Sequence, residues 1–368
     1  AGRGCAREGE ARPSGHSTAA NNRNQKNMSL SETALPFDDI RNLVKSMPGP
    51  DEDALARVKA RDAELTKPAG SLGRLEEIAE WLAAWSGKAP PKITRPMVGI
   101  FATAHGVADE GVSAFPSAVN RQMVENFAAG GAAINQICRA YDIGLKVFDL
   151  AVDMPTPSIT REDAMDEANC AATMAYGMEA LAGGIDLICL GEMGIGNTTV
   201  AAAVINALFG GKAEDWIGRG TGVDDEGLAR KRDAVEKAVA RLNGERDPLE
   251  ILRRIGGREI AAMTGLIIAA RLQRVPVIVD GFVTTAAAAV VYAMDPAGLD
   301  HCLFAHVSAE QAHAKVLEHM GKDALLDFGM RLGEGSGAAL AAGIAKAAAE
   351  MHSGMATFAD AGVSEKDD

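Results

Sequence analysis

The sequence predicts an α/β protein in which a mainly parallel sheet is flanked by helices, in a Rossmann-like arrangement. From residue 97 onward, short continuous apolar runs alternate with helical stretches, which is typical of strands buried on both faces. Hydrophobic residues make up 47% of the 368 residues but aromatic residues only 4%, so the apolar mass is mostly Ala, Leu, Ile and Val. The 40 glycines indicate many tight turns between these elements.

The net charge and the spacing of the cysteines argue against several classes of protein. A formal net charge of −13 argues against a general nucleic-acid or anionic-membrane binder, which would carry a basic face. A phosphate ligand would therefore need local partners, such as a lysine, helix N-termini and glycine-rich loops. The five cysteines show no C-x-x-C spacing, so neither a zinc knuckle nor a disulfide framework is indicated. No apolar run reaches the ~20 residues of a membrane span, and we expect a cytoplasmic protein.

The first part of the chain is predicted to be helical after a polar start. Residues 1–27 lack the apolar core of a signal peptide, and we interpret them as a disordered extension or an artefact. Residues 37–65 carry acidic helical patterning. Pro68 and Gly70 end that pattern, and Ser71 can cap the helix that follows.

That next helix has one apolar stripe, which we expect to pack into the core. Its members recur at i, i+3, i+7 and i+10: Leu75, Ile78, Leu82 and Trp85. Residues 88–96 contain three prolines and are expected to link this helical part to the main domain.

Five apolar runs are predicted to be strands. In open parallel sheets ligands bind beyond the carboxyl ends of the strands, and Gly, His, Glu, Asp and Ser follow these runs. The runs cover residues 98–102, 145–152, 186–190, 275–279 and 302–305.

Two glycine-rich segments are candidates for phosphate binding. Gly191–Thr199 follows a predicted strand and opens an Ala/Val-rich helix, so it is either an anion-binding turn or a tight strand-to-helix connection. It lacks the full dinucleotide fingerprint and the Lys-Ser/Thr pair of a P-loop. Gly218–Gly227 leads into a helix with Arg230, Lys231 and Arg232. That helix presents either an exposed basic face or, at Lys231, a partner for an anion.

The segment Ala104–Pro116 places His105 at the end of the first strand. His105 is there either a hydrogen-bonded turn residue or a donor that faces a ligand. The sequence has no H-x-x-H, no H-E-x-x-H and no clustered His/Cys set, so we expect no dedicated metal site. The absence of a G-x-S-x-G elbow leaves serine-hydrolase chemistry without support.

The segment Arg331–Leu340 sets one carboxylate, Glu334, between glycines ahead of an Ala/Leu-rich helix. The free N–H groups at the start of that helix make Glu334 a candidate structural cap. The glycines also allow a ligand to come close, and Glu334 would then be a base aimed at it. The motif by itself leaves both interpretations open.

Six segments, in their order along the chain, closely resemble the nicotinate-nucleotide:dimethylbenzimidazole phosphoribosyltransferases of the cobalamin nucleotide-loop pathway. Each segment alone is modest, but the ordered set is highly specific, and the resemblance runs from about residue 36 to residue 363. The segments are residues 67–76, 105–119, 127–135, 191–199, 279–282 and 332–337.

The resemblance implies that nicotinate mononucleotide gives its phosphoribosyl group to 5,6-dimethylbenzimidazole, yielding α-ribazole 5'-phosphate and nicotinate with inversion. It also implies a homodimer that uses no cofactor and no metal. A large α/β catalytic domain, residues 96–337, would stand beside a small helical domain built from both chain ends, residues 28–95 and 338–368.

The family's roles transfer to the residues that match its motifs. The resemblance implies that Glu334 is the general base and that Glu192 is a second carboxylate near the ribose. On the phosphoribosyl side of the substrates it places Gly194, Gly196, Asn197, Lys231, Asp280 and Ser308. Against the benzimidazole it places Phe115, Gln122 and Leu332. Two residues depart from the family pattern: Ala104 stands where Asp or Asn is usual, and Asn120 replaces a common Thr.

Two other functions compete with a phosphoribosyltransferase. An NAD-dependent oxidoreductase also uses glycine-rich strand–helix turns, but it does not explain the paired glutamates. A non-catalytic nucleotide or base sensor would keep the pocket and lose turnover, and Ala104 is its only hint. Tight NADH binding would favour the first, and a failure to release nicotinate would favour the second.

Overall fold

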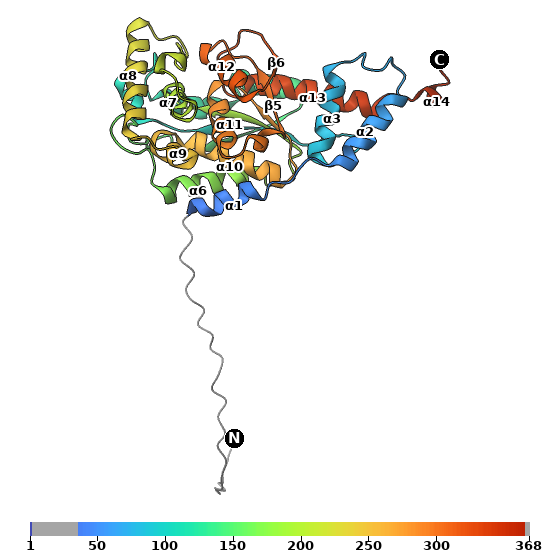
Figure 1. Cartoon of the computed structure of the whole chain (residues 1–368), viewed down its shortest axis with the longest axis horizontal. Helices are drawn as coiled ribbons and strands as arrows, with labels where there is room; N and C mark the ends of the chain where they lie inside the picture. The colour runs from blue at the N-terminus through green and yellow to red at the C-terminus, as the bar shows by residue number, and fades with distance from the viewer. Residues whose placement is uncertain (2–35, 365–368) are drawn as a thin grey trace. The chain divides into compact units, whose positions relative to one another are not determined.

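A six-stranded parallel sheet forms the centre of the protein, as the sequence predicts (Figure 1). The computed structural model describes residue 1 and residues 36–364, so the expectation for residues 1–27 falls, apart from residue 1, outside the described residues. The strands follow the spatial order β2-β1-β3-β4-β5-β6, and all neighbours are parallel. Their bounds are Pro96–Ala102 (β1), Gly144–Asp149 (β2), Leu187–Met193 (β3), Val277–Val279 (β4), Cys302–His306 (β5) and Ala324–Leu326 (β6).

The five predicted strands are all present, but their bounds differ from the prediction. The third strand continues to Met193, so Glu192 lies inside β3, opposite Phe101 of β1, rather than beyond the end of the strand. The sequence prediction lacks β6, because its three residues are only partly buried and too few to form a recognisable apolar run. β6 extends the sheet by one short strand next to β5.

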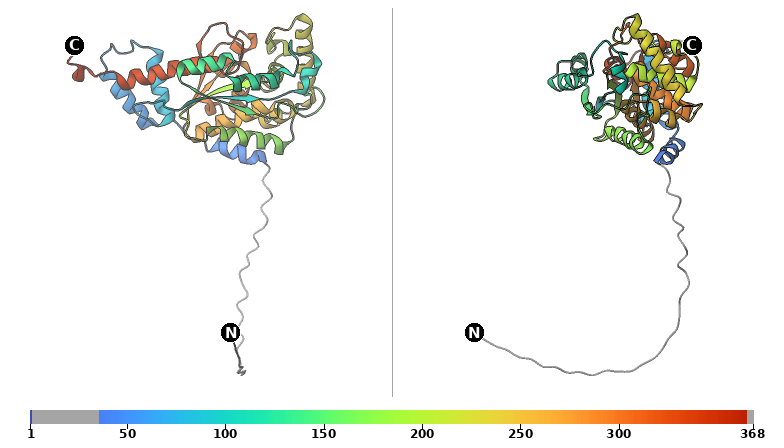
Figure 2. Two further views of the ribbon diagram at one scale, coloured as in Figure 1. Left: turned by 180° about the vertical axis from the view of Figure 1, so that it is seen from behind. Right: turned by 90° about the vertical axis from the view of Figure 1, so that its left-hand side faces the viewer.

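Helices cover both faces of the sheet (Figures 1 and 2). On one face, α10 (Arg258–Leu272) and α11 (Phe282–Met294) contact the central strands. On the other face, α13 (Ser336–Gly354) lies across the sheet, with α4 (Val119–Ala129) and α5 (Ala133–Tyr141) beside β2. The other helices are α1 (Pro36–Lys45), α2 (Glu52–Glu64), α3 (Arg74–Ser86), α6 (Glu167–Met178), α7 (Asn197–Phe209), α8 (Asp225–Arg241), α9 (Pro248–Ile255), α12 (Gln311–Met320) and α14 (Phe358–Ala361).

Alternate residues of β3 belong to different apolar cores. Ile188 and Leu190 pack into the core formed with α10 and α11, and Leu187 and Cys189 pack into the core formed with α13. All four side chains are fully buried. This explains why the strand reads as a continuous apolar run rather than an alternating one.

The region predicted as one helical pattern, residues 37–65, forms two helices. Pro48 and Pro50 separate α1 from α2, because proline has no backbone N–H and restricts the residue before it. The Asp51 side chain then accepts a hydrogen bond from the N–H of Ala54 and caps α2.

The start of α3 corrects one prediction and its stripe confirms another. Ser71 does not cap this helix, because α3 begins at Arg74 after Gly73, and no side chain caps it. Ser71 lies earlier, in a turn where its N–H donates to the carbonyl of Pro68. The apolar stripe is buried as expected, fully at Ile78, Leu82 and Trp85 and partly at Leu75.

The two ends of the described chain pack against each other. The guanidinium of Arg61, in α2, donates to the carbonyls of His352, Ser353 and Met355 at the end of α13. The Nε2 atom of buried His352 lies 3.1 Å from the carbonyl oxygen of Val58. Helix α3 contacts both α2 and α13, so helices from distant parts of the sequence lie together beside the sheet (Figure 1).

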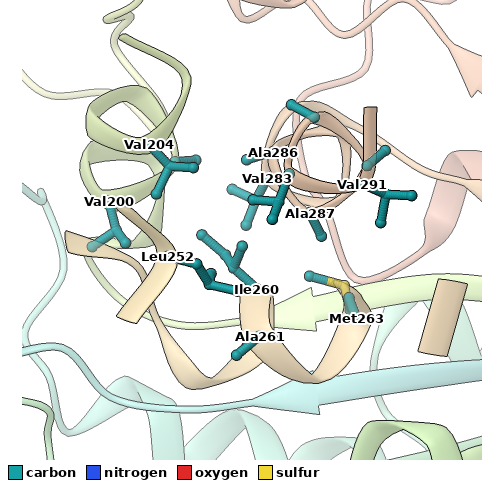
Figure 3. Packing of buried hydrophobic residues seen from close by; sticks show 14 of the residues in the cluster. Val200, Val204, Leu252, Ile260, Ala261, Met263, Val283, Ala286, Ala287 and Val291 are labelled. Carbon is teal, nitrogen blue, oxygen red and sulfur yellow. The ribbon is translucent and has the colours of Figure 1, made fainter. Parts of the chain in front are cut away.

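The larger apolar core joins four helices through small and β-branched side chains (Figure 3). Because alanine adds little bulk, α11 can lie close to α7, α9 and α10. The labelled contacts come from Val200, Val204, Leu252, Ile260, Ala261, Met263, Val283, Ala286, Ala287 and Val291. In the part of the chain that the structure describes, no helix is both long and apolar enough to cross a membrane.

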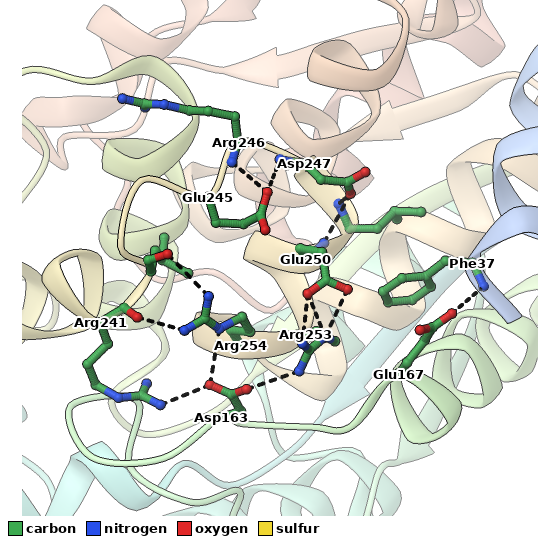
Figure 4. A network of polar contacts seen from close by, with 12 residues as sticks. Phe37, Asp163, Glu167, Arg241, Glu245, Arg246, Asp247, Glu250, Arg253 and Arg254 are labelled. Carbon is green, nitrogen blue, oxygen red and sulfur yellow. Dashed lines mark hydrogen bonds and ion pairs between the residues drawn. The ribbon is translucent and has the colours of Figure 1, made fainter. Parts of the chain in front are cut away.

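A polar network anchors the segment that leads into α6 (Figure 4). The carboxylate of Asp163 accepts hydrogen bonds from Arg241 of α8 and from Arg253 and Arg254 of α9. Burial would raise the pKa of Asp163, but hydrogen bonds from these arginines lower it below its usual range. The network therefore ties helices α8 and α9 to one carboxylate.

Helices α6 and α10 approach each other backbone to backbone, and glycine makes this possible. A Cβ added at Gly177 would lie 1.9 Å from the carbonyl oxygen of Ala262, and one added at Gly265 would lie 2.1 Å from that of Met174. A methyl group fits at neither position without moving a helix.

We therefore expect Gly177→Ala to lower the free energy of unfolding by about 1–3 kcal/mol or more, because the two helices must separate. Gly354→Ala is the matched control, since Gly354 ends α13 with open space around its Cα. That change should leave stability equal or slightly higher. Urea denaturation of both variants measures the difference, and equal midpoints would contradict the close packing of α6 on α10.

Candidate active site

A cavity of about 270 Å³ opens at the carboxyl edge of the sheet, beyond β3, β4 and β5. Parallel sheets place ligands at this edge. Seven of the residues that the sequence analysis singles out line the cavity: Phe115, Glu192, Gly194, Asn197, Ser308, Leu332 and Glu334.

The other four predicted site residues lie around this cavity rather than on its wall. A hollow of about 40 Å³ adjoins it through Gly194 and Asn197, and Gly196 and Lys231 line that hollow. Asp280 is fully buried after β4 and lines neither space, and Gln122 on α4 is also absent from both walls.

The turn before α13 has an unusual backbone. Gly333, Glu334 and Gly335 have φ values of 86°, 65° and 79°, all in the left-handed region that L-residues rarely adopt. Such strained conformations cluster at functional sites. Helix α13 begins at Ser336 without a side-chain cap, so the interpretation of Glu334 as its cap is wrong. The Glu334 carboxylate lines the cavity instead.

Close backbone contact joins this turn to the end of β3. A Cβ added at Gly333 would lie 2.4 Å from Oε1 of Glu192, and one added at Gly191 would lie 2.9 Å from the carbonyl oxygen of Glu334. Glycine at both positions therefore lets the turn lie directly on the strand. As a result, Glu192 and Glu334 share one wall of the cavity.

Asp280 supplies the cap that α13 lacks. Its Oδ1 atom accepts a hydrogen bond of 2.7 Å from the N–H of Ala338, at the positive end of the helix. Burial raises the pKa of Asp280 to about 7, although backbone N–H groups of Ala338, Gly337 and Gly335 oppose the rise. Asp280 therefore holds α13, and with it the preceding turn, against the sheet.

The two glutamates of the cavity wall both have raised pKa values. Burial raises the pKa of Glu192 to about 8; the charges of Asp280, Glu259 and Glu334 add to the rise, and a hydrogen bond from Asn197 opposes it. Burial also raises the pKa of Glu334, whereas the backbone N–H of Ile134 lowers it. The charge of Glu334 therefore favours the protonated form of Glu192.

Lys231 is buried beside the cavity and bonded to the glycine-rich loop. Its Nζ atom donates to Oγ1 of Thr198 and to the carbonyl of Gly218, both at 2.9 Å. Burial lowers the pKa of Lys231, and the charge of Glu310 partly offsets this. An ammonium has three N–H donors, and two of them have partners among residues 36–364, while Lys231 also lines the hollow.

Three titratable residues that line the cavity, Glu310, Arg331 and His306, are absent from the predicted site. Glu310 accepts a hydrogen bond from the N–H of Gly220, and Arg331 donates to the carbonyl of Gly220, each at 2.9 Å. Each of these charged residues therefore fixes the glycine-rich loop. His306 ends β5, and its Nε2 lies 3.8 Å from Oδ1 of Asp280. The sequence shows His306 directly after the last predicted strand, which is the signal for a place at this edge of the sheet, but its spacing from the other histidines predicts no metal-ligand set.

Ser308 is oriented by a buried histidine. Its backbone N–H donates to Nδ1 of His313, so Nε2 carries the ring proton and donates to Oγ1 of Thr285, each at 2.9 Å. Burial lowers the pKa of His313 to about 3, which keeps the ring neutral. A neutral histidine thus positions Ser308 at the cavity wall.

The arrangement fits an enzyme that holds an anionic substrate in glycine-rich turns and acts on it with buried carboxylates. The family described as "Phosphoribosyltransferase" matches residues 47–363 of the chain, which sets the class of protein.

The relatives identify the family within that class. The nicotinate-nucleotide–dimethylbenzimidazole phosphoribosyltransferase of Rhizobium leguminosarum bv. trifolii (strain WSM2304) is 64% identical over 92% of this chain and 100% of its own length. The protein of the same name from Brucella anthropi is 65% identical over 91% of this chain and 99% of its own. The crystal structure of CobT from Thermus thermophilus has a TM-score of 0.79 at 42% identity, covering 85% of this chain and 100% of that one. The chain belongs to the nicotinate-nucleotide–dimethylbenzimidazole phosphoribosyltransferase family.

The raised pKa of Glu192 predicts a pH effect on stability. Its folded-state pKa, about 8, lies above the ordinary 4.5, so the folded protein binds an extra proton between these values and loses stability as the pH rises through them. Glu192→Gln cannot ionise. The Tm of this variant, relative to the Tm of the wild type, should therefore rise between pH 5 and pH 8 by on the order of 5 °C. Thermal unfolding across this range measures the gap, and a constant gap would show that Glu192 titrates normally.

Proposed function

We propose that this protein transfers the phosphoribosyl group of nicotinate mononucleotide to 5,6-dimethylbenzimidazole, giving α-ribazole 5'-phosphate and nicotinate. The observation that carries the proposal is the meeting of Glu192 and Glu334 on one wall of a cavity, beside glycine-rich turns that suit a phosphate. The names and high identity of the relatives support the choice of substrates.

The reaction exchanges one C–N bond for another at the ribose. The bond between C1' and the pyridinium nitrogen breaks, and its electron pair stays on nicotinate, which leaves without needing a general acid. The lone pair of a benzimidazole ring nitrogen forms the new bond from the opposite face, so the anomeric configuration inverts. Positive charge develops on the ribose between these events, and an ionised Glu192 stabilises it.

Glu334 is the general base in this proposal. When benzimidazole forms the new bond, its other ring N–H becomes acidic, and the carboxylate of Glu334 takes that proton. Burial raises the pKa of Glu334, which makes its carboxylate a stronger base than an exposed glutamate. The left-handed backbone at Glu334 holds the side chain in place before the substrates arrive.

The charge of the donor substrate suits the state of Glu192. In the free protein the pKa of Glu192 is about 8, so the carboxyl group is mostly protonated at pH 7. A pyridinium cation nearby favours the ionised form. We infer that binding of nicotinate mononucleotide releases a proton from this group and supplies the carboxylate that the ribose cation needs.

The phosphate fits the hollow beside the main cavity in this proposal. The N–H groups around Gly194 and Gly196 and the remaining N–H of Lys231 supply donors there, and Ser308 lines the adjoining main cavity. In this proposal Asp280 does not touch the phosphate. It supports the site through its hydrogen bond to the first turn of α13.

The acceptor base fits the apolar part of the cavity. Phe115 and Leu332 line it while remaining 49% and 53% exposed, and Val119 and Met123 of α4 complete this side. A flat aromatic ring can cover such side chains and remove them from water. Gln122 lies on the same helix, three residues after Val119 and directly before Met123.

The direct test combines the purified protein with both substrates and follows nicotinate and α-ribazole 5'-phosphate by chromatography. We expect both products in equal amounts and none when either substrate is omitted. Nicotinate without the ribazole product would indicate hydrolysis, and no nicotinate at all would favour a non-catalytic binding protein.

Glu334→Gln should lower kcat by about 10²–10⁴-fold, because the amide cannot accept the benzimidazole proton. Binding of nicotinate mononucleotide should stay close to that of the wild type, which calorimetry can show. A variant that is folded yet turns over near the normal rate would remove Glu334 from the role of base.

Lys231→Gln should raise the KM for nicotinate mononucleotide by about 10–100-fold, because one charged hydrogen bond to the phosphate is lost. Glutamine can still donate to the carbonyl of Gly218 and so preserve the loop. The KM for 5,6-dimethylbenzimidazole should change little in steady-state kinetics. The reverse pattern would place the phosphate elsewhere.

We also propose a cytoplasmic homodimer whose small helical domain comes from both chain ends. The packing of α2 and α3 on α13 supports this domain. Phe328 and Leu332, which are 66% and 53% exposed, leave apolar surface that a second subunit would cover. Light scattering should give twice the mass of the chain, and a monomer at micromolar concentration would reject the dimer.

A further inference from the structure

His105 and Glu259 form a buried pair that the reaction above leaves without a role. His105 follows β1, and Glu259 lies in the first turn of α10. Both side chains are almost completely buried, and Nε2 of His105 lies 3.0 Å from Oε1 of Glu259. The pair therefore connects the carboxyl edge of the sheet to a helix on one of its faces.

The pair lies directly beneath the turn that lines the cavity. A Cβ added at Gly194 would lie 3.1 Å from Nε2 of His105. A Cβ added at Gly257 would lie 2.4 Å both from Cε1 of His105 and from Oε2 of Glu259. The imidazole of His105 thus packs against Gly194. Glu259 and the backbone at Gly257 pack against the imidazole in turn.

Burying this polar pair lowers the stability of the fold. Within residues 36–364, the ring nitrogens of His105, both carboxylate oxygens of Glu259 and the hydroxyl of Thr103 are buried without a well-directed hydrogen bond. Buried polar groups without partners lower stability, and a hydrophobic pair of similar size would avoid the loss. Departures from good packing of this kind are expected at functional sites.

We propose that His105 and Glu259 are positioning residues for the transfer reaction. Together they hold the Gly194 turn, and through it Glu192 and Asn197, in the geometry that the ribose cation requires. The pair touches neither substrate and acts through this turn. The proposal rests on the proposed function, because it assigns the pair to that reaction.

The charges around Glu192 show how the pair also acts electrostatically. Burial raises the pKa of Glu192, and the facing carboxylates Asp280 after β4, Glu259 of α10 and Glu334 before α13 raise it further. The other titratable or charged groups near this wall are His105, His306, Lys231, Glu310 and Arg331. Loss of the charge on Glu259 therefore lowers the pKa of Glu192.

The decisive variant is Glu259→Gln, which keeps the size of the side chain and removes its charge. We expect kcat to fall about 10–100-fold, because the turn loses its fixed position. The KM for 5,6-dimethylbenzimidazole should stay within about twofold, since that base binds on the other side of the cavity. The acid limb of the pH profile of kcat/KM should move to lower pH. Glu259→Asp should restore part of the rate.

His301→Gln is the matched control. His301 is also buried, and its Nε2 bonds to the carbonyl of Ile267, but it precedes β5 at the amino edge of the sheet. We expect lower stability with an unchanged kcat and pH profile. The same result for Glu259→Gln would overturn the proposal and leave the pair as core packing.

A second measurement separates this proposal from the proposed function. If the wild type released no nicotinate, the proposed function would fail. Thermal unfolding would still test whether Glu259 acts on Glu192. The pH-dependent gain in Tm that Glu192→Gln gives should be smaller when Glu259→Gln is already present. An equal gain in both backgrounds would overturn the coupling between Glu259 and Glu192.

Discussion

The site depends on one close backbone contact, where the Gly333–Gly335 turn lies on the end of β3. A side chain at Gly191 or Gly333 would occupy the space of the facing strand or of Glu192 itself. Because the two segments touch, carboxylates from distant parts of the sequence share one wall of a cavity. Gly333 and Gly335 adopt left-handed backbone readily, so the conformational cost of this contact falls on Glu334, whose φ is 65°. The packing of α13 against the sheet must offset that cost.

Asp280 links the contact to the rest of the fold. It follows β4 and accepts the N–H of Ala338, so one buried carboxylate replaces the missing side-chain cap of α13. The helix in turn brings a row of small residues onto the sheet, where seven of its eight alanines are buried. A resemblance between sequences places Asp280 on the phosphoribosyl side of the substrates. In the structure Asp280 is buried and bonds to the first turn of α13.

The sequence predicts the sheet well because buried parallel strands leave continuous apolar runs, and it predicts the cavity because polar residues follow those runs. It misses β6, whose three residues carry no such signal. It places a cap at Ser71 because it cannot show that the turn continues to Gly73. Glu310, Arg331 and the His105–Glu259 pair also escape, because each acts through a contact between segments far apart in the chain. Such contacts follow from the folded geometry rather than from local spacing.

The crowding of buried carboxylates gives the free site a preference for a cation. Burial raises the pKa of Glu192 to about 8, and repulsion by Asp280, Glu259 and Glu334 contributes to the rise. In the proposed reaction, a pyridinium ring relieves that repulsion when it binds, whereas the neutral nitrogen of nicotinate, formed when the bond breaks, does not. The same electrostatics therefore favour the donor substrate over its leaving group. In the proposed reaction, the free protein gives up some stability at neutral pH, and the pyridinium of the bound donor substrate offsets this loss by pairing with the ionised Glu192.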